Sequence, residues 1–186
     1  MNSINKNQKE ENHKDLSSIE AAEKIKELGE DKTCFFCTSH GSKGTARPMS
    51  VQKIDAEGNV WFLSANDSTQ NKEIEADPTV NLYFQGNSYS DFMHLYGKAS
   101  ISEDKKIIKE LWKPMLKTWF TEGENDPRIS VIKFTPEEGY YWINKHGMVV
   151  AGIKMLIGAA TGKTLDDSLE GELNTERLHK NHIAHG

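Results

Sequence analysis

The stretch TVNLYFQG, residues 79–86, decides the fold class. Val80, Leu82 and Phe84 alternate with more polar residues, and this period of two predicts a β-strand that turns one apolar face toward the core. Residues 81–86 also match, apart from its leading glutamate, a protease recognition sequence that is often engineered beside purification tags. Because the stretch lies in mid-chain, where the remnant of a tag does not belong, we interpret it as a native strand.

The chain around this strand has the pattern of a meander with few helices. Runs of strand-forming residues between turn residues predict further strands at 33–39, 45–54, 60–65, 88–102, 129–136 and 138–145. Helical spacing predicts helices at 19–28, 66–77 and 103–120, the last interrupted at Pro114. This order favours an antiparallel β-barrel over a doubly wound sheet. The segment 149–164 fits either a strand or a short helix.

The predicted helix starts carry capping signals. Ser17 and Glu20 have the spacing of a capping box, and the first helix is expected to end at Gly29. Asp67 or Ser68 is the expected N-cap of the second helix.

Composition and charge point to one domain with polar ends. We assign residues 16–165 to the domain, residues 1–15 to a disordered N-terminal tail and residues 166–186 to a loose polar tail. The net charge of −5 predicts a soluble, weakly acidic surface without a nucleic-acid or membrane partner. No apolar run approaches the roughly 18 residues of a membrane helix, and the N-terminus lacks the apolar core of a secretory signal, so we expect a cytoplasmic protein.

The cysteines and the C-terminal histidines do not predict a metal site. Cys34 and Cys37 form a C-x-x-C motif, but residues three apart on a strand point to opposite faces, so we expect two unlinked core thiols. No second such pair completes a zinc site. His179, His182 and His185 are expected to belong to the solvated tail.

Polar groups gather where the strand at 60–65 gives way to the helix at 66–77. If the strands at 45–54 and 60–65 pair as a hairpin, Arg47 lies beside Ser64. The helix start adds backbone N–H groups and the hydroxyls of Ser68 and Thr69, and Lys72 follows one turn later. Cations and a helix N-terminus favour a phosphate dianion, although a plain helix cap with two surface cations explains each piece alone.

Residues 47–84, RPMSVQKIDAEGNVWFLSANDSTQNKEIEADPTVNLYF, resemble the flavin-binding split barrels related to pyridoxamine 5′-phosphate oxidase. The later stretches LWKPMLKTWF, NDPRISVIKFTPEEGYYW and AATGK are similar to the bacterial general stress protein branch of that superfamily. The resemblance extends over about residues 15–165. It implies a mainly β fold with some α structure: a split antiparallel β-barrel of Greek-key type with flanking helices.

The resemblance also implies a homodimer that binds FMN at the subunit interface. The residues that would hold the FMN phosphate are Arg47 and Lys72, helped by Ser64, Ser68 and Thr69. The residues whose backbone would face the isoalloxazine ring are Met49, Ser50 and Val51. Trp142 would approach the flavin from the partner chain, or it is an ordinary core or interface aromatic residue.

The chain departs from the oxidase proper at its substrate contacts. Asn71 and Gln52 stand where the oxidase has basic residues. Arg177, Leu178 and His179 repeat the oxidase's C-terminal motif, but in the polar tail, where we interpret the match as chance. We therefore do not expect this protein to make pyridoxal phosphate.

The resulting hypothesis is an FMN-binding flavoprotein of the general stress type, a flavin-dependent oxidoreductase of unknown substrate. A non-catalytic flavin-binding stress module, acting as a sensor or cofactor store, is the alternative; a haem-binding split barrel, which would need a histidine ligand, is a third. No side chain stands out as an acid or base, so the catalytic residues are unknown. His40, His94 and His146 are candidates only by residue type.

Overall fold

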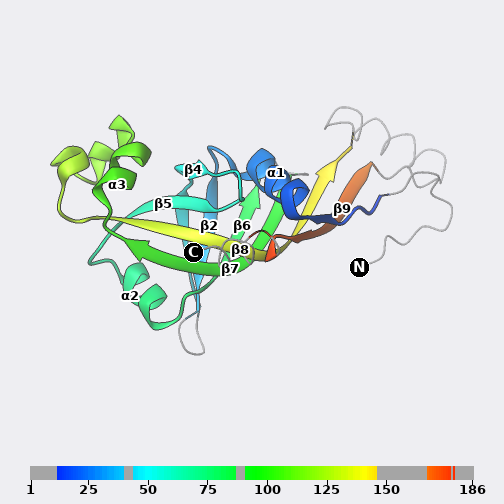
Figure 1. Ribbon diagram of the computed structural model, residues 1–186, viewed down its shortest axis with the longest axis horizontal. Helices are drawn as coiled ribbons and strands as arrows, with labels where there is room; N and C mark the ends of the chain where they lie inside the picture. Colours follow the sequence, from blue (N-terminus) through cyan, green and yellow to red (C-terminus); the bar gives the residue numbers. More distant parts are fainter. Residues whose placement is uncertain (1–11, 40–43, 87–90, 146–166, 177, 179–186) are drawn as a thin grey trace, which may run out of the picture.

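The computed structural model describes residues 12–39, 44–86, 91–145, 167–176 and 178 of the 186-residue chain. In these residues one nine-stranded sheet is flanked by three α-helices (Figure 1). The helices are α1 (Ser18–Gly29), α2 (Thr69–Ala76) and α3 (Lys105–Leu111). The strands are β1 (Leu16–Ser17), β2 (Thr33–Thr38), β3 (Thr45–Ser50), β4 (Lys53–Ile54), β5 (Val60–Ala65), β6 (Thr79–Gln85), β7 (Phe92–Ser102), β8 (Ile129–Asn144) and β9 (Ser168–Asn174).

The sheet is an open, mostly antiparallel barrel. Its strand order is β1-β9-β8-β7-β6-β2-β3, and β5 branches from β8 to pair with β4. Among the strands of the described residues, β1 and β9 alone pair in parallel, and an isolated parallel bridge joins His13 to Glu170 beside them. Strands β1 and β3 end the path without pairing with each other among the described residues, so the barrel does not close there. The mainly β, split-barrel prediction is therefore confirmed.

Strand β6 has the alternation that its sequence predicts. Val80, Leu82 and Phe84 are buried, whereas Tyr83 and Gln85 are exposed. The strand pairs with β2 on one side and with β7 on the other. The stretch that matches a protease site is thus a central strand of the sheet.

Strand β8 is a single 16-residue strand, where we predicted two strands at 129–136 and 138–145. Its first half pairs with β5 and its second half with β9, while β7 follows it on the other side. Pro136 lies opposite Gly97, where a bulge shifts the register between Tyr96 and Gly97. The bulge accommodates a proline, which has no N–H to give to the ladder, without ending the strand.

The strand predicted at 45–54 is divided into β3 and β4. Strand β3 pairs with β2, and β4 pairs with β5. The hairpin that we assumed between the strands at 45–54 and 60–65 therefore forms only near its turn. Arg47 is opposite Phe36 in the ladder, and Ser64 is opposite Ser130.

Helix α1 lies close to its predicted position but begins differently. Ala22, Ile25 and Leu28 are buried against the barrel, whereas Ile19 is 63% exposed. Ser17 is the N-cap but makes no capping hydrogen bond through its side chain, and its backbone pairs with Asn174 in the β1–β9 ladder. The predicted capping box is therefore wrong.

The C-terminal boundary predicted at 166 also differs from the structure. Residues 168–174 form β9 and pair with β8. The chain before β1 runs beside this strand, where the Lys14 N–H donates to the Glu170 carbonyl at 2.8 Å. The buried Tyr141 hydroxyl donates to the Lys14 carbonyl at 2.7 Å. The segment 149–164 and the three tail histidines lie outside the described residues.

Two apolar clusters hold the molecule together. The larger one fills the barrel and includes Ile25 of α1, Phe36 of β2 and Phe134 of β8. The smaller one lies under α3 and the following 3-10 helix, Pro114–Thr118, and includes Ile108 and Leu116. Across the described segments, no helix has the length and apolar character needed to cross a membrane.

Both cysteines are free thiols on opposite faces of β2, as predicted. Cys34 faces the core, and burial raises the pKa of its thiol to about 12. Cys37 is only half-buried on the other face, so the expectation that both lie in the core is wrong for this residue. The described part of the chain contains no cluster of residues suited to a metal ion.

Candidate functional site

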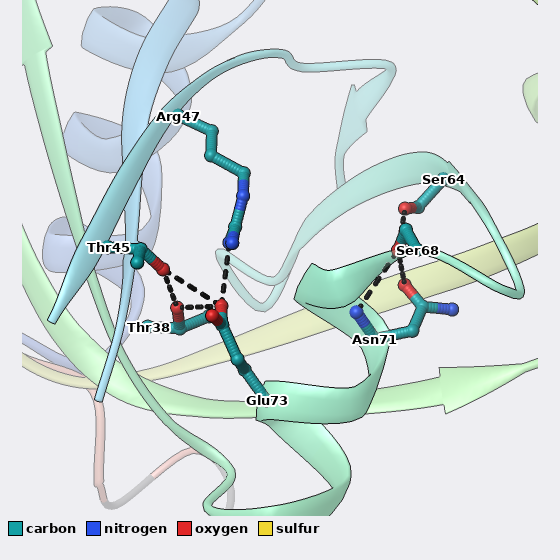
Figure 2. Close-up of polar contacts among 7 residues, drawn as sticks. All are labelled: Thr38, Thr45, Arg47, Ser64, Ser68, Asn71 and Glu73. Carbon is teal, nitrogen blue, oxygen red and sulfur yellow. Dashed lines mark hydrogen bonds and ion pairs between the residues drawn. The ribbon is translucent and has the colours of Figure 1, made fainter. Parts of the chain in front are cut away.

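Arg47 reaches helix α2 where the helix packs beside β2. The Arg47 side chain is on the same face as the fully buried Phe36, because directly paired residues of a ladder share a face. Thr45 and Thr38 form the next pair of this kind. Figure 2 shows Arg47 extending from β3 toward Glu73 on α2. The positive charge of Arg47 on β3, at the edge of the sheet, therefore lies beside α2.

Helix α2 begins with a side-chain cap. The Ser68 hydroxyl accepts the Asn71 N–H at 3.1 Å, which confirms Ser68 as the N-cap. Ser64 at the end of β5 reaches the same point, with its hydroxyl oxygen 3.2 Å from that of Ser68 (Figure 2). These two hydroxyls, predicted to help hold a phosphate, are thus already engaged in a structural cap. Thr69, the first helical residue, is exposed.

Asn71 ties this cap to the sheet. The residue is 1% exposed, and its side-chain amide donates to the Ser130 hydroxyl at 2.8 Å. The Ser130 hydroxyl in turn donates to the Ser64 carbonyl at 3.0 Å. Residue 71, noted above only because it lacks the positive charge of the oxidase, is therefore a buried structural link between α2, β5 and β8.

Glu73 is the site residue that sequence analysis missed. Its side chain is 7% exposed, and its carboxylate lies 2.8 Å from Nη1 of Arg47. The Arg47 guanidinium, together with hydrogen bonds from Thr38 and Thr45, holds the pKa of this carboxyl at about 2, although burial opposes the shift. The only sequence signal was an acidic residue next to Lys72, which is usual on an exposed helix face.

The Arg47 guanidinium is not fully satisfied by this ion pair. Its Nη1 atom is buried, yet no N–H of that nitrogen is directed along a hydrogen bond to an acceptor in the described residues. The proximity of Glu73 therefore compensates charge without completing the hydrogen bonding of Arg47. The Arg47 side chain stays 27% exposed, so the rest of the guanidinium is accessible to an anionic ligand.

Lys72 of α2 supplies a second cation besides Arg47 of β3. It is exposed and forms no ion pair within the described segments. Its backbone N–H closes the first turn of α2 on the Ser68 carbonyl at 3.3 Å. Lys72 is thus a residue of α2, and Arg47 reaches the same helix through its ion pair with Glu73 rather than through a β-hairpin with Ser64.

Strand β3 presents one backbone edge to the exterior. It pairs only with β2 and ends the strand path, so its other edge has no strand partner in the described part of the chain. Met49 is half-buried, and Ser50 is exposed. The side chain of Val51 is buried and its N–H donates to the Lys32 carbonyl at 2.9 Å, so this N–H is already in use. The edge suits a planar ligand that bonds to main-chain groups.

Trp142 lies on a different part of the sheet from Arg47. It lies on β8, four steps along the sheet from β3, which corresponds to about 19 Å at the usual strand spacing. It is 45% exposed and lines an open groove with Phe92 and Tyr140. Phe35 and Tyr83 continue the same groove across β2 and β6.

His94 is the one candidate histidine that the structure describes; His40 and His146 lie outside the described residues. Its ring stacks on Tyr83, with centroids 4.6 Å apart, in the groove that contains Trp142. Its Nε2 atom lies 2.8 Å from Oδ1 of Asn81. Burial lowers the pKa of His94, so the neutral ring is favoured.

Comparisons with known proteins identify the class of fold and then the family. A protein from Jannaschia sp. CCS1 assigned as a general stress protein 26 superposes with a TM-score of 0.68 at 23% identity, over 82% of this chain and 96% of the other. The general stress FMN/FAD binding protein of Xanthomonas citri gives a TM-score of 0.59 at 22% identity, over 69% of this chain and 91% of the other. The chain therefore has the split-barrel fold of these proteins.

The sequence itself gives the family. The model of the pyridoxamine 5′-phosphate oxidase-like family matches residues 20–166. The chain belongs to this family. Protein bli-3 of Neurospora crassa is 25% identical over 127 residues, which cover 63% of this chain. The chain spans 61% of the length of that curated relative.

Proposed function

We propose that the protein is an FMN-binding flavoprotein of the general stress type that acts as a flavin-dependent oxidoreductase. The observation that carries this proposal is the position of Arg47 beside α2, where Glu73 pairs with Nη1 and the side chain stays 27% exposed. Lys72 and the start of α2 add positive potential at the same place. The X. citri protein is named a general stress FMN/FAD binding protein, and this name supports a flavin as the ligand.

Different residues of the chain would contact different parts of FMN. Arg47 and Lys72 bind the phosphate, and Thr69 adds a hydroxyl at the helix start. The backbone of Met49 and Ser50 bonds to the edge of the ring. Ser64 and Ser68 act chiefly through the cap that fixes the start of α2. The bound flavin supplies the redox chemistry by accepting and passing on electrons.

The site is proposed to be completed by a second copy of the chain. One barrel leaves a groove of exposed aromatic residues that includes Phe35, Tyr83, Phe92 and Trp142. Aromatic residues are enriched at protein interfaces because of their large apolar area, and tyrosine and tryptophan add a polar group. In a two-fold homodimer, Trp142 of each chain would approach the flavin held by the other.

Binding of the phosphate is tested by comparing FMN with riboflavin, which lacks it. Lys72→Ala is expected to weaken FMN binding by roughly one decade, since a charge-assisted contact contributes about 1.5 kcal/mol or more. Riboflavin affinity should stay constant. Lys109→Ala, which removes an exposed cation from α3, is the matched control. Equal FMN affinity in Lys72→Ala, Arg47→Ala and the unaltered protein would refute the site.

Turnover is tested separately from binding. The purified protein should show flavin absorbance, and NADH or NADPH should reduce the bound flavin in steady state if the protein is an oxidoreductase. A flavin that binds but is reduced by neither donor would favour the non-catalytic stress module. A haem band in place of the flavin bands would contradict the proposal.

A further inference from the structure

A carboxylate is built into the proposed phosphate site. Oε2 of Glu73 accepts hydrogen bonds from Thr38 at 2.6 Å and from Thr45 at 2.9 Å, and it lies 2.8 Å from Nη1 of Arg47 (Figure 2). A buried negative charge beside an anion site opposes the binding of a phosphate. Its presence there needs an explanation.

The two threonines fix the position of this carboxylate. Each hydroxyl has one hydrogen to donate, and the two hydroxyl oxygens are themselves 2.9 Å apart. At most two of the three hydroxyl contacts are therefore hydrogen bonds at any moment, and Oε2 remains an acceptor in each arrangement. A glutamine at position 73 can accept the same bonds through its carbonyl oxygen. Charge and position are thus separable by mutation.

Glu73 pairs with only one of the three nitrogen atoms of the guanidinium. Arginine has five N–H groups, and the ion pair involves Nη1 alone. The Arg47 side chain remains 27% exposed. Glu73 therefore holds Arg47 against α2 and leaves other N–H groups of the guanidinium available for a ligand.

We propose that Glu73 is an internal counter-anion of the phosphate site, which positions Arg47 and weakens the binding of the FMN phosphate. This inference rests on the proposed function. Arg47 and Lys72 bring two positive charges, and Glu73 cancels one of them. The ligand phosphate, with a charge of about −1.5 to −2, meets roughly half of the positive charge that the two cations would otherwise present. The flavin is accordingly held in an exchangeable state.

The test is a titration of the full-length apoprotein with FMN and with riboflavin, followed by flavin fluorescence. Glu73→Gln keeps the acceptor and removes the charge, so FMN should bind on the order of tenfold more tightly at low salt. Riboflavin affinity should not change, and added salt should reduce the gain. Glu75→Gln, an equal charge change at an exposed position of α2, should have a much smaller effect. FMN binding in Glu73→Gln that is no tighter than in the unaltered protein overturns the inference.

A second comparison covers the case in which Glu73→Gln does not fold. Replacing both members of the pair leaves no unpaired buried charge, and such replacements are often neutral for stability. Arg47→Met/Glu73→Met is therefore expected to bind FMN more tightly than Arg47→Met alone. Equal or weaker binding by the double variant overturns the inference. If Arg47→Met and Lys72→Ala both leave the ratio of FMN to riboflavin affinity unchanged, the proposed phosphate site itself is wrong.

Discussion

Thr38 of β2 donates a hydrogen bond of 2.6 Å to the buried carboxylate of Glu73 on α2. With Arg47 and Thr45, this contact fastens the helix to the sheet edge and holds the pKa of Glu73 at about 2, below its ordinary value of 4.5. The carboxylate that we propose to weaken phosphate binding therefore also links protonation to folding.

Acid should weaken the protein partly through Glu73. Because the pKa of this group is lowered by folding, its contribution to the free energy of unfolding is present above about pH 4.5 and is lost as the pH falls toward 2. Glu73→Gln should be less stable at pH 7 by about 1.5–3 kcal/mol, the contribution of hydrogen bonds to a charged group. Its urea-unfolding curves should converge with those of the unaltered protein near pH 2.

The control for this experiment is Glu75→Gln on the exposed side of α2, which should run parallel to the unaltered protein at every pH. Asp126, whose pKa is also held at about 2 by Arg128, remains in both variants and keeps part of the acid sensitivity. A constant difference between Glu73→Gln and the unaltered protein from pH 7 to pH 2 would contradict the linkage.

Asn71 should matter for stability more than its place on a short helix suggests. Asn71→Ala removes the amide that bonds Ser130 and the oxygen that faces Ser68. Loss of buried hydrogen-bond partners of this kind should lower the free energy of unfolding by about 1–3 kcal/mol. Thr69→Ala, at an exposed position of the same helical turn, should change it by no more than about 0.5 kcal/mol. Equal urea midpoints for the two variants would show that the Asn71 network contributes little.

The parts of the fold that sequence predicts best are those set by local pattern. The alternation of Val80, Leu82 and Phe84 predicts β6 because one face of this strand is buried. Ser68 is predictable as an N-cap because the capping residue and the helix that it starts are adjacent in the chain. In both cases the interaction that fixes the structure spans only a few residues.

The missed features depend on partners that are distant in sequence. The division between β3 and β4 follows from a change of neighbouring strand, which leaves no mark on the period of residues 45–54. Strand β9 has few apolar residues and is fixed by pairing with β8. Glu73 finds its hydroxyl donors 28 and 35 residues away. Such a carboxylate has the same sequence signature as an exposed one.

The native protein should resist the protease whose recognition sequence it resembles. Cleavage after Gln85 requires β6 to leave its pairing with β7, where Gln85 is opposite Phe92 and Gly86 donates to the Asp91 carbonyl at 3.0 Å. Release of a paired central strand requires local unfolding. The matched control is the same chain with VNLYFQG added in a flexible terminal linker, where the protease should cut readily. Comparable rates at the two sites would show that β6 opens easily.

Dimer formation should depend on Trp142. Both copies of this exposed residue would enter the interface, and truncation of a buried tryptophan anchor typically costs at least about 2 kcal/mol, or roughly a 30-fold rise in the dissociation constant. Trp119 is also exposed, at 63%, but lies beyond α3 at the smaller apolar cluster, so Trp119→Ala is the matched control.

Sedimentation of apo and FMN-loaded protein across a concentration series should show a dimer for the unaltered protein and for Trp119→Ala. Trp142→Ala should already be monomeric at protein concentrations at which the other two proteins are still dimers. FMN should favour the dimer in all three, since a ligand stabilises the state that binds it. A monomer that keeps full FMN affinity at nanomolar concentration would rule out a site shared between two chains.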